Sequence, residues 1–182
     1  MNVVSLAIPE VLSIEPVVHG DDRGFFLESW HAARYGAAGI ALPFVQDNHS
    51  RSVRGTLRGL HYQLEQPQGK LVRVTAGEVF DVAVDLRRSS PTFGQWVSAV
   101  LSDANRRQLW VPPGFAHGFY VLSPSADLLY KCTEYYAPEH DRTLHWDDAD
   151  VGIRWPLVEG RSPLLSAKDA AGSCFRDAPT YG

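Results

Sequence analysis

The feature that most limits the possible folds is a series of short strand-like segments, about ten residues apart and separated by turn-forming residues. The clearest is a strand pair at Lys70–Leu86, in which two apolar stretches flank a turn at Thr75–Glu78. Many short strands at this spacing predict an all-β sandwich or barrel. The further predicted strands are Trp96–Leu101, Gln108–Val111, Phe115–Leu122 and Leu128–Tyr136.

The length and composition predict one folded domain. The chain has 182 residues, of which 45% are hydrophobic and 21% charged. We expect a single domain over residues 1–182, with a few short helices near Ser29–Tyr35 and Ala167–Ala171 and a loose tail at about residues 172–182. The first ten residues lack the features of a signal peptide, and no stretch approaches the roughly 20 apolar residues of a membrane span. We therefore predict a cytoplasmic protein with no membrane partner.

The charged residues and cysteines narrow the function further. The net charge of −4 argues against a nucleic-acid-binding surface. Three of the 17 basic residues are lysines and the other 14 are arginines, whose planar fork suits phosphate, so a local anion site stays open. Cys132 and Cys174 match no metal or redox spacing and are predicted to be reduced thiols.

Two histidines stand at the ends of glycine-containing strand–turn segments, Gly55–His61 and Pro112–His117. These segments resemble the two halves of the cupin signature, which implies a jelly roll. The metal-binding version needs a second histidine two residues after the first, where this chain has Gln63. Only Glu65 offers a further hard ligand nearby, and a transition metal needs three or four. The two histidines are then either structural residues or a base that titrates near neutrality, and no metal site is predicted.

Several longer blocks resemble the dTDP-4-dehydrorhamnose 3,5-epimerase family, in order and without a large insertion over about residues 3–170. The resemblance implies a double-stranded β-helix, the cupin-like jelly roll. It implies an isomerase that forms a homodimer and needs no metal or coenzyme. Its reaction in dTDP-L-rhamnose biosynthesis would be epimerisation at C3 and C5 of dTDP-4-dehydro-6-deoxy-D-glucose to dTDP-4-dehydro-L-rhamnose. The blocks are Leu57–Gln63, Gly69–Val74, Asp81–Arg87, Ser90–Gly94, Gln108–Pro112, Gly114–Phe119, Tyr130–Thr133, Tyr135–Tyr136 and Leu165–Asp169.

This chemistry defines four catalytic roles. Removal of a proton beside the C4 ketone gives an enolate, so the enzyme needs a base, a cation near the C4 oxygen and an acid on the opposite ring face. The chemistry and the resemblance together make His61 the base. The resemblance implies that Asp169 orients His61 and that Tyr130 is the acid, and Lys70 fits the cation. Without the resemblance, Tyr130 would be read as a core aromatic and Asp169 as a surface turn residue.

The resemblance also implies a set of substrate contacts. Arginines would hold the diphosphate and sugar, and acidic and amide side chains the nucleotide. Tyr136 and one of Phe25 and Phe26 would stack on the thymine, but a one-residue bulge would exchange the two phenylalanines. Asp141 stands where the family commonly has a glutamate. The full predicted set is Arg23, Glu28, Gln46, Asn48, Arg58, His117, Tyr136, Asp141 and Lys168.

Other functions stay open at this stage. The nearest alternative is a related sugar-nucleotide epimerase that acts at C3 or C5 only. More remote are a non-catalytic sugar-nucleotide-binding cupin and a metal-dependent cupin, the latter disfavoured by Gln63. For the expected homodimer, the apolar segments Val3–Val4 and Val11–Leu12 near the N-terminus need a sheet to join, and we expect an N-terminal strand to cross to the partner's sheet.

Overall fold

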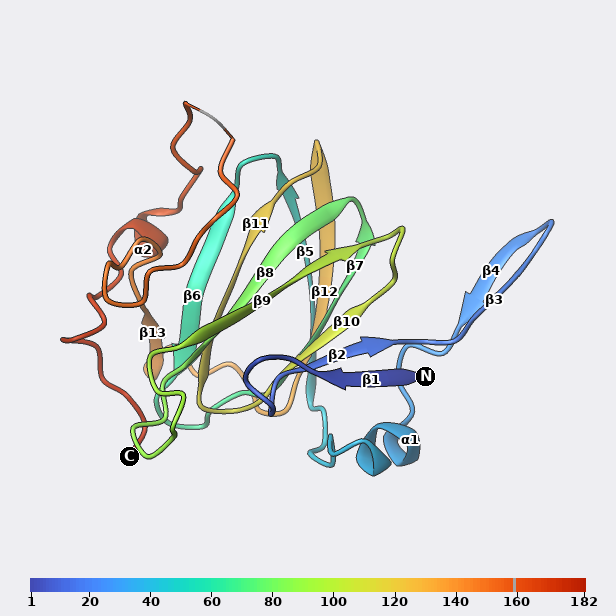
Figure 1. The fold of residues 1–182 in the computed structure, drawn as a ribbon, viewed down its shortest axis with the longest axis horizontal. Coiled ribbons are helices and arrows are strands. Elements are labelled where there is room, and N and C mark those ends of the chain that lie inside the picture. The colour runs from blue at the N-terminus through green and yellow to red at the C-terminus, as the bar shows by residue number, and fades with distance from the viewer. Residues whose placement is uncertain (159) are drawn as a thin grey trace.

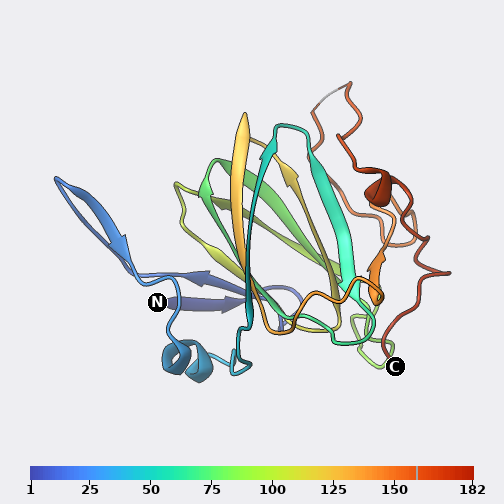
Figure 2. The ribbon, with the colours of Figure 1, turned by 180° about the vertical axis from the view of Figure 1, so that it is seen from behind.

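The computed structural model describes residues 1–158 and 160–182 as two facing β-sheets with a projecting hairpin and two short helices (Figures 1 and 2). The helices are α1 (Ala32–Ala37) and α2 (Ala167–Ala170). The strands are β1 (Asn2–Ser5), β2 (Leu12–Glu15), β3 (Val18–Asp21), β4 (Gly24–Leu27), β5 (Gln46–Val53), β6 (Leu57–Gln63), β7 (Lys70–Ala76), β8 (Glu78–Asp85), β9 (Trp96–Ser102), β10 (Gln108–Val111), β11 (Phe115–Val121), β12 (Ser125–Cys132) and β13 (Asp141–Thr143).

The two sheets enclose the main core. One has six strands in the order β1-β2-β10-β7-β12-β5, and the other has five in the order β13-β6-β11-β8-β9. Alternate residues point inward, so Val72 and Leu128 of the first sheet pack with Val79 and Phe119 of the second. Apolar area removed from water at this interface stabilises the fold by about 25 cal/mol per Å². The expected all-β jelly roll is confirmed.

The predicted strands at Lys70–Leu86 exist, but they do not pair with each other. β7 pairs with β10 and β12, whereas β8 pairs with β9 and β11 in the opposite sheet. Gly77 makes the corner between the sheets with φ of +78°, and a Cβ there would lie 2.1 Å from the Ser125 carbonyl oxygen. The two strands are joined by a tight turn, but they belong to opposite sheets. The expected pairing between them is therefore wrong.

Two element boundaries also differ from the prediction. β12 spans Ser125–Cys132, so it begins before Leu128 and ends before Tyr136. Helix α1 begins at Ala32 rather than Ser29, because the His31 side chain accepts a hydrogen bond from the Arg34 amide and serves as its N-cap.

The N-terminal strands join the sheet of their own chain. β1 pairs with β2, and β2 pairs with β10, so Val3 and Leu12 pack with Ile14 and Trp110 against helix α1. These two segments therefore need no partner's sheet, and the crossing of an N-terminal strand to a partner stays a prediction. The sheet that they need is supplied by β10 of the same chain.

The segment that leaves the body of the molecule is instead the β3–β4 hairpin (Figures 1 and 2). All of its residues except Leu27 are exposed. Phe25 and Phe26 have 59% and 70% of their surface exposed, which is unusual for large apolar side chains.

The last residues are not a loose tail. Backbone hydrogen bonds join Tyr181 to Leu86 and Arg88, and Ser173 pairs with Leu144 and His145. The Tyr181 hydroxyl donates to the Gln63 carbonyl at 2.5 Å. These contacts order the C-terminus against the outer side of the five-stranded sheet, where the sequence pattern alone gave no reason to expect it. No helix in the described part of the chain is both long enough and apolar enough to cross a membrane.

Candidate active site

A cavity of about 280 Å³ lies between the two sheets and is lined by strands β5, β6, β7, β12 and β13 together with α2. Three of the four predicted catalytic residues line it, namely His61, Lys70 and Tyr130. Of the predicted substrate contacts it holds Gln46, Asn48, Tyr136, Asp141 and Lys168. Residues from five strands and one helix therefore converge on one hollow, as expected of a binding site inside a barrel.

Close approach of two strands places His61 at the cavity. His61 on β6 lies directly opposite His117 on β11, and a register shift follows between His117 and Phe119. The strands touch at Gly59 and Gly118, since a Cβ on Gly59 would lie 2.5 Å from the Gly118 Cα. Gly59 also has φ of +132°, which other residues rarely adopt. Gly59, two residues before His61, and Gly118, the residue after His117, are therefore required by the backbone contact between β6 and β11.

The fourth catalytic residue, Asp169, lies behind His61. His61 Nε2 is 2.6 Å from Asp169 Oδ1, across 108 residues of sequence. The Gly59 amide donates to the same oxygen at 3.2 Å, and the Ser166 hydroxyl donates to Oδ2 at 2.6 Å. Helix α2 carries Asp169 in its first turn and packs beside β6 (Figure 1). The predicted pairing of these two residues is present in the structure.

The environment sets the protonation of this pair. Burial raises the pKa of Asp169, but hydrogen bonds from His61, Ser166 and Gly59 outweigh it and hold the pKa well below the usual carboxyl range. Burial lowers the pKa of His61 from 6.5, helped by Lys168 and Lys70 and opposed by Asp169. An ionised carboxylate only accepts, so His61 carries its proton on Nε2 and keeps the free lone pair on Nδ1. The pair is arranged as a neutral base with a fixed tautomer.

Lys70 brings a cation into the same cavity. It is 9% exposed, and its Nζ lies 3.5 Å from the His61 carbonyl oxygen. Burial lowers the pKa of Lys70, and the nearby Cys132, Asp141 and Asp81 raise it in part. A buried ammonium with so few contacts in the chain is well placed to meet an anion on a bound molecule.

Tyr130 lies on β12 between Asn48 of β5 and Val72 of β7. Its phenol is half-buried, and burial raises its pKa above 10.0. The side chain therefore stays protonated at neutral pH and can donate a proton. Cys132, two residues on, is fully buried on the same side of the strand, and its thiol accepts a hydrogen bond from the Asn48 amide at 3.5 Å.

Three predicted substrate contacts form a network at the mouth of the cavity. The Tyr136 hydroxyl donates to Asp141 Oδ2 at 2.9 Å, and Lys168 makes a short ion pair with the same oxygen. Asp141 lies on β13, opposite Gln63 of β6. The shorter aspartate, at a position where the family commonly has a glutamate, thus reaches both neighbours directly.

Comparison with known proteins identifies the family of the chain. The family model described as dTDP-4-dehydrorhamnose 3,5-epimerase matches residues 5–177. The chain is 59% identical over 182 residues to the dTDP-4-dehydrorhamnose 3,5-epimerase of Pseudomonas aeruginosa, covering 100% of this chain and 99% of that protein. The chain belongs to the dTDP-4-dehydrorhamnose 3,5-epimerase family. Membership confirms the family expected from the sequence, and it makes the chain an isomerase.

Solved structures of epimerases have the same fold. A dTDP-6-deoxy-D-glucose-3,5-epimerase from Legionella pneumophila Philadelphia 1, in complex with dTDP-4-keto-L-rhamnose, matches with a TM-score of 0.95 and 56% identity, over 98% of this chain and 94% of that one. A 3'-monoepimerase from Streptomyces bikiniensis, in complex with dTDP-quinovose, matches with a TM-score of 0.87 and 35% identity, over 94% of this chain and 87% of that one. Both dual and single epimerases therefore share this architecture.

Two predicted contacts of the epimerase lie beside the cavity rather than in its lining. Arg58 on β6 donates from Nε to the Ser52 hydroxyl at 3.0 Å. His117 is buried, and its Nε2 is 2.8 Å from Oδ1 of the fully buried Asp81. The sequence alone indicated no role for the Asp81 carboxylate or the Ser166 hydroxyl, although both residues lie inside the matched blocks.

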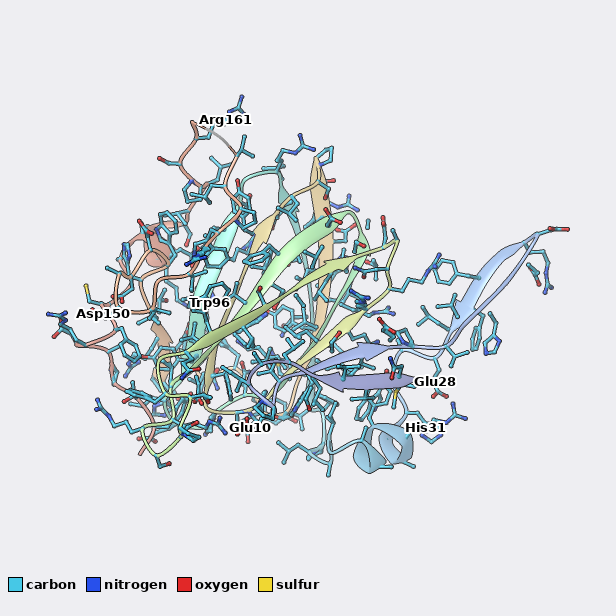
Figure 3. The ribbon with its side chains drawn as sticks, in the orientation of Figure 1. Glu10, Glu28, His31, Trp96, Asp150 and Arg161 are labelled. Carbon is cyan, nitrogen blue, oxygen red and sulfur yellow. The ribbon has the colours of Figure 1, made fainter. Side chains whose placement is uncertain are left out.

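The other two predicted contacts lie far from the cavity in the same chain. Arg23 sits at the turn of the β3–β4 hairpin, where its side chain is 90% exposed and makes an ion pair with Asp21. Glu28 follows the hairpin and pairs with Arg34 of α1; Figure 3 labels it near His31, on the far side of the molecule from α2. The structure therefore does not bring Arg23 and Glu28 together with the catalytic residues of their own chain.

Gln63 is used for structure at the position where metal-binding cupins have a histidine. Its amide nitrogen donates to the carbonyls of Gln66 and Tyr135, and its amide oxygen accepts from the Ala137 amide. These bonds hold the loops that flank the cavity mouth. Among residues 1–158 and 160–182 there is no group of three or more His, Cys, Asp or Glu side chains placed to bind a metal ion.

Proposed function

We propose that this chain epimerises dTDP-4-dehydro-6-deoxy-D-glucose at C3 and C5, giving dTDP-4-dehydro-L-rhamnose in dTDP-L-rhamnose biosynthesis. The observation that carries the proposal is the pairing of His61 with Asp169 at 2.6 Å at the wall of a cavity that also holds Lys70 and Tyr130. A base, a cation and an acid thus face one hollow, which is the set that enolate chemistry requires.

The first step is removal of a proton from the carbon next to the C4 ketone. His61 Nδ1 takes the proton from C3 or C5, and the C–H electron pair moves to form the enolate with negative charge on the C4 oxygen. Asp169 stabilises the imidazolium that results. The Lys70 ammonium stabilises the enolate oxygen, and because Lys70 is buried this interaction is stronger than in bulk solvent.

The second step returns a proton to the opposite face of the ring. Tyr130 donates its phenolic proton to the same carbon, which inverts the centre, and the ketone re-forms. Solvent then reprotonates the phenolate and accepts the proton from His61, so the cycle closes without a metal or coenzyme. The raised pKa of Tyr130 supports this role because the phenol starts each cycle protonated.

We assign the rest of the cavity to substrate binding. Gln46, Asn48 and Tyr136 line the cavity, which supports contacts of the first two with the nucleotide and stacking of Tyr136 on the base. Lys168 is a candidate for the diphosphate, with Arg58 and His117 nearer the sugar. We further propose a cytoplasmic location, which the two free thiols Cys132 and Cys174 support because disulfides are rare in reducing compartments.

Two predicted contacts point to a homodimer. Arg23 and Glu28 cannot serve the cavity of their own chain, and the hairpin that carries Arg23 projects from the body with Phe25 and Phe26 exposed. We propose that each hairpin packs on a second copy, where its phenylalanines leave water and Arg23 reaches the partner's substrate.

Subunit complementation tests this arrangement. Arg23→Ala and His61→Asn proteins are each expected to be impaired, and mixing them with subunit exchange creates dimers with one intact site. Activity should therefore rise above the sum of the two. Light scattering should give twice the chain mass at micromolar concentration. A monomer, or mixed activity equal to the sum, would contradict the proposed dimer.

Epimerisation at one carbon only is the second candidate, because a 3'-monoepimerase shares the fold. Incubation with substrate in D₂O decides between the two. We expect deuterium at both C3 and C5 and an L-rhamno product by NMR. Deuterium and inversion at one carbon only would favour the second candidate, and no exchange at either carbon would refute both.

A further inference from the structure

The hydrogen bonds of Asp169 divide between two tasks. Oδ1 faces the base, with His61 Nε2 at 2.6 Å and the Gly59 amide at 3.2 Å. Oδ2 faces Ser166, whose hydroxyl donates to it at 2.6 Å and whose amide lies at 3.4 Å. Hydrogen bonds to both oxygens therefore fix the plane of the carboxylate. Among the described residues, those to Oδ2 come from Ser166.

The same serine begins helix α2. Its Oγ accepts from the Asp169 amide at 3.1 Å, and the Asp169 side chain returns to the Ser166 amide, so the two form a capping box. The third helical residue of this box is Asp169. Here that residue is the carboxylate that orients His61, so the helix cap and the catalytic pair share one side chain.

We propose that Ser166 is a positioning residue of the epimerase: its hydroxyl turns the Asp169 carboxylate so that Oδ1 meets His61 Nε2. Ser166, Asp169 and His61 then act as one hydrogen-bonded chain that ends at the base. The inference rests on the proposed function, because it assigns Ser166 a part in the same reaction.

The shape of α2 explains why a separate group is needed. The helix has four residues, and its only buried residue is Asp169, so little packing holds it in place. Burial raises the pKa of Asp169, and the hydrogen bond from the Ser166 hydroxyl is, after that from His61, the second contribution that lowers it. Without that bond Oδ2 keeps only the long contact with the Ser166 amide among the described residues, so the carboxylate is held less firmly about its Cβ–Cγ bond and the imidazole has a less fixed partner.

A set of variants separates positioning from capping. Ser166→Ala removes the hydroxyl and the cap, whereas Ser166→Gly removes the hydroxyl and keeps a residue that serves well as an N-cap. Ser166→Thr keeps both. His31→Ala removes the cap of the other helix, α1, which lies outside the cavity and serves as the matched control for lost stability.

Steady-state kinetics give the first readout. We expect kcat of Ser166→Ala and Ser166→Gly to fall about tenfold to a hundredfold with KM within about twofold, since misplacement of a catalytic group acts on the transition state. Ser166→Thr should recover most of the loss, and His31→Ala should keep the wild-type kcat while melting at a lower temperature. If Ser166→Gly keeps the wild-type kcat, the serine is only a cap and the proposal is overturned.

Proton NMR gives a readout that does not depend on the substrate. The Nε2 proton shared by His61 and Asp169 should give a low-field resonance that is absent in His61→Asn. We expect it to broaden by faster solvent exchange in Ser166→Ala and Ser166→Gly and to stay sharp in Ser166→Thr and His31→Ala. A sharp resonance in Ser166→Gly would overturn the proposal even if the chain catalyses another reaction, and an inactive wild type with the expected NMR pattern would refute only the proposed function.

Discussion

The barrel contains two histidine–aspartate pairs. Their histidines, His61 on β6 and His117 on β11, occupy directly opposite positions on neighbouring strands. His61 and Asp169 are 2.6 Å apart, and His117 and Asp81 are 2.8 Å apart. The pairs differ in access to solvent. The side chain of His61 is 31% exposed at the cavity, whereas that of His117 is 8% exposed and Asp81 is fully buried.

The two carboxylates also differ in how many of their oxygens accept hydrogen bonds. Both oxygens of Asp169 have partners, but within the described residues Asp81 Oδ2 has none. A base must take a proton from substrate and release it to water, which only the exposed pair can do. We therefore propose that the same two residue types serve as a base in one pair and as a buried support beside Lys70 in the other, and that exposure decides which.

Removing each histidine gives the largest expected contrast. His61→Asn should lower kcat by about a thousandfold, because general base catalysis contributes roughly 10²–10⁴. It should change the free energy of unfolding little, since the site is open to water. His117→Ala should instead lower the free energy of unfolding by about 3 kcal/mol or more, because it leaves the Asp81 carboxylate buried without a partner.

Turnover assays and urea unfolding of both variants measure this contrast. dTDP binding by calorimetry should be nearly unchanged in His61→Asn, which controls for an intact cavity. If His117→Ala costs more activity than His61→Asn while staying folded, the roles of the two pairs are reversed.

Tyr130→Phe separates proton removal from inversion. The ring and its packing remain but the phenolic proton is lost, so His61 can still form the enolate and return a solvent-derived proton to the same face. We expect inverted product to fall about a hundredfold while exchange of substrate protons with D₂O falls much less. Equal loss of exchange and inversion would place Tyr130 in proton removal or binding instead.

Asp169→Asn weakens the exposed pair without removing its base. The amide cannot stabilise the imidazolium as a carboxylate does, and it favours the wrong tautomer of His61. We expect kcat to fall by more than about tenfold, which corresponds to roughly 1.4 kcal/mol of transition-state stabilisation. A smaller loss, measured with KM unchanged, would argue against the pair as a functional unit.

The pH dependence of kcat/KM gives the smallest expected effect. His61 must be neutral to accept a proton, so activity falls as the pH drops through its pKa. Burial lowers that pKa from 6.5, with Lys168 and Lys70 acting in the same direction, so the acid limb should lie below pH 6.5. Asp169 raises the pKa of His61, so the limb of Asp169→Asn should move lower still. A limb above pH 6.5 in the wild type would contradict this account.

Sequence patterns predicted the strands far better than their partners. Alternation of apolar residues identified β7 and β8 because side chains of a strand alternate between faces, but it does not say which strand lies alongside. The turn at Gly77 therefore looked like a hairpin and is a corner between two sheets. The same limit hid the contacts of Tyr181, since a residue near the end of the chain carries no local pattern that names Leu86 as its partner.

In the candidate active site, too, the sequence indicated single residues better than the partners that they contact. His61 was predicted from its own chemistry and its glycine-rich context, but its pairing with Asp169 spans 108 residues and came only from the family resemblance. Asp81 drew no attention because an acidic residue in an apolar strand does not reveal whether it faces water or a histidine. Arg23 was predicted from the family resemblance, which does not reveal that its side chain is 90% exposed on a projecting hairpin.

The most direct test of the central claim, that His61 with Asp169 is the base for both carbons, is deuterium incorporation at C3 and C5 followed by NMR in D₂O. Wild type, His61→Asn and His117→Ala are compared at saturating substrate. The account predicts that His61→Asn loses exchange at both carbons together, by about a thousandfold, while folded His117→Ala retains exchange at both. Loss at one carbon only, or exchange in His61→Asn close to the wild-type rate, would contradict it.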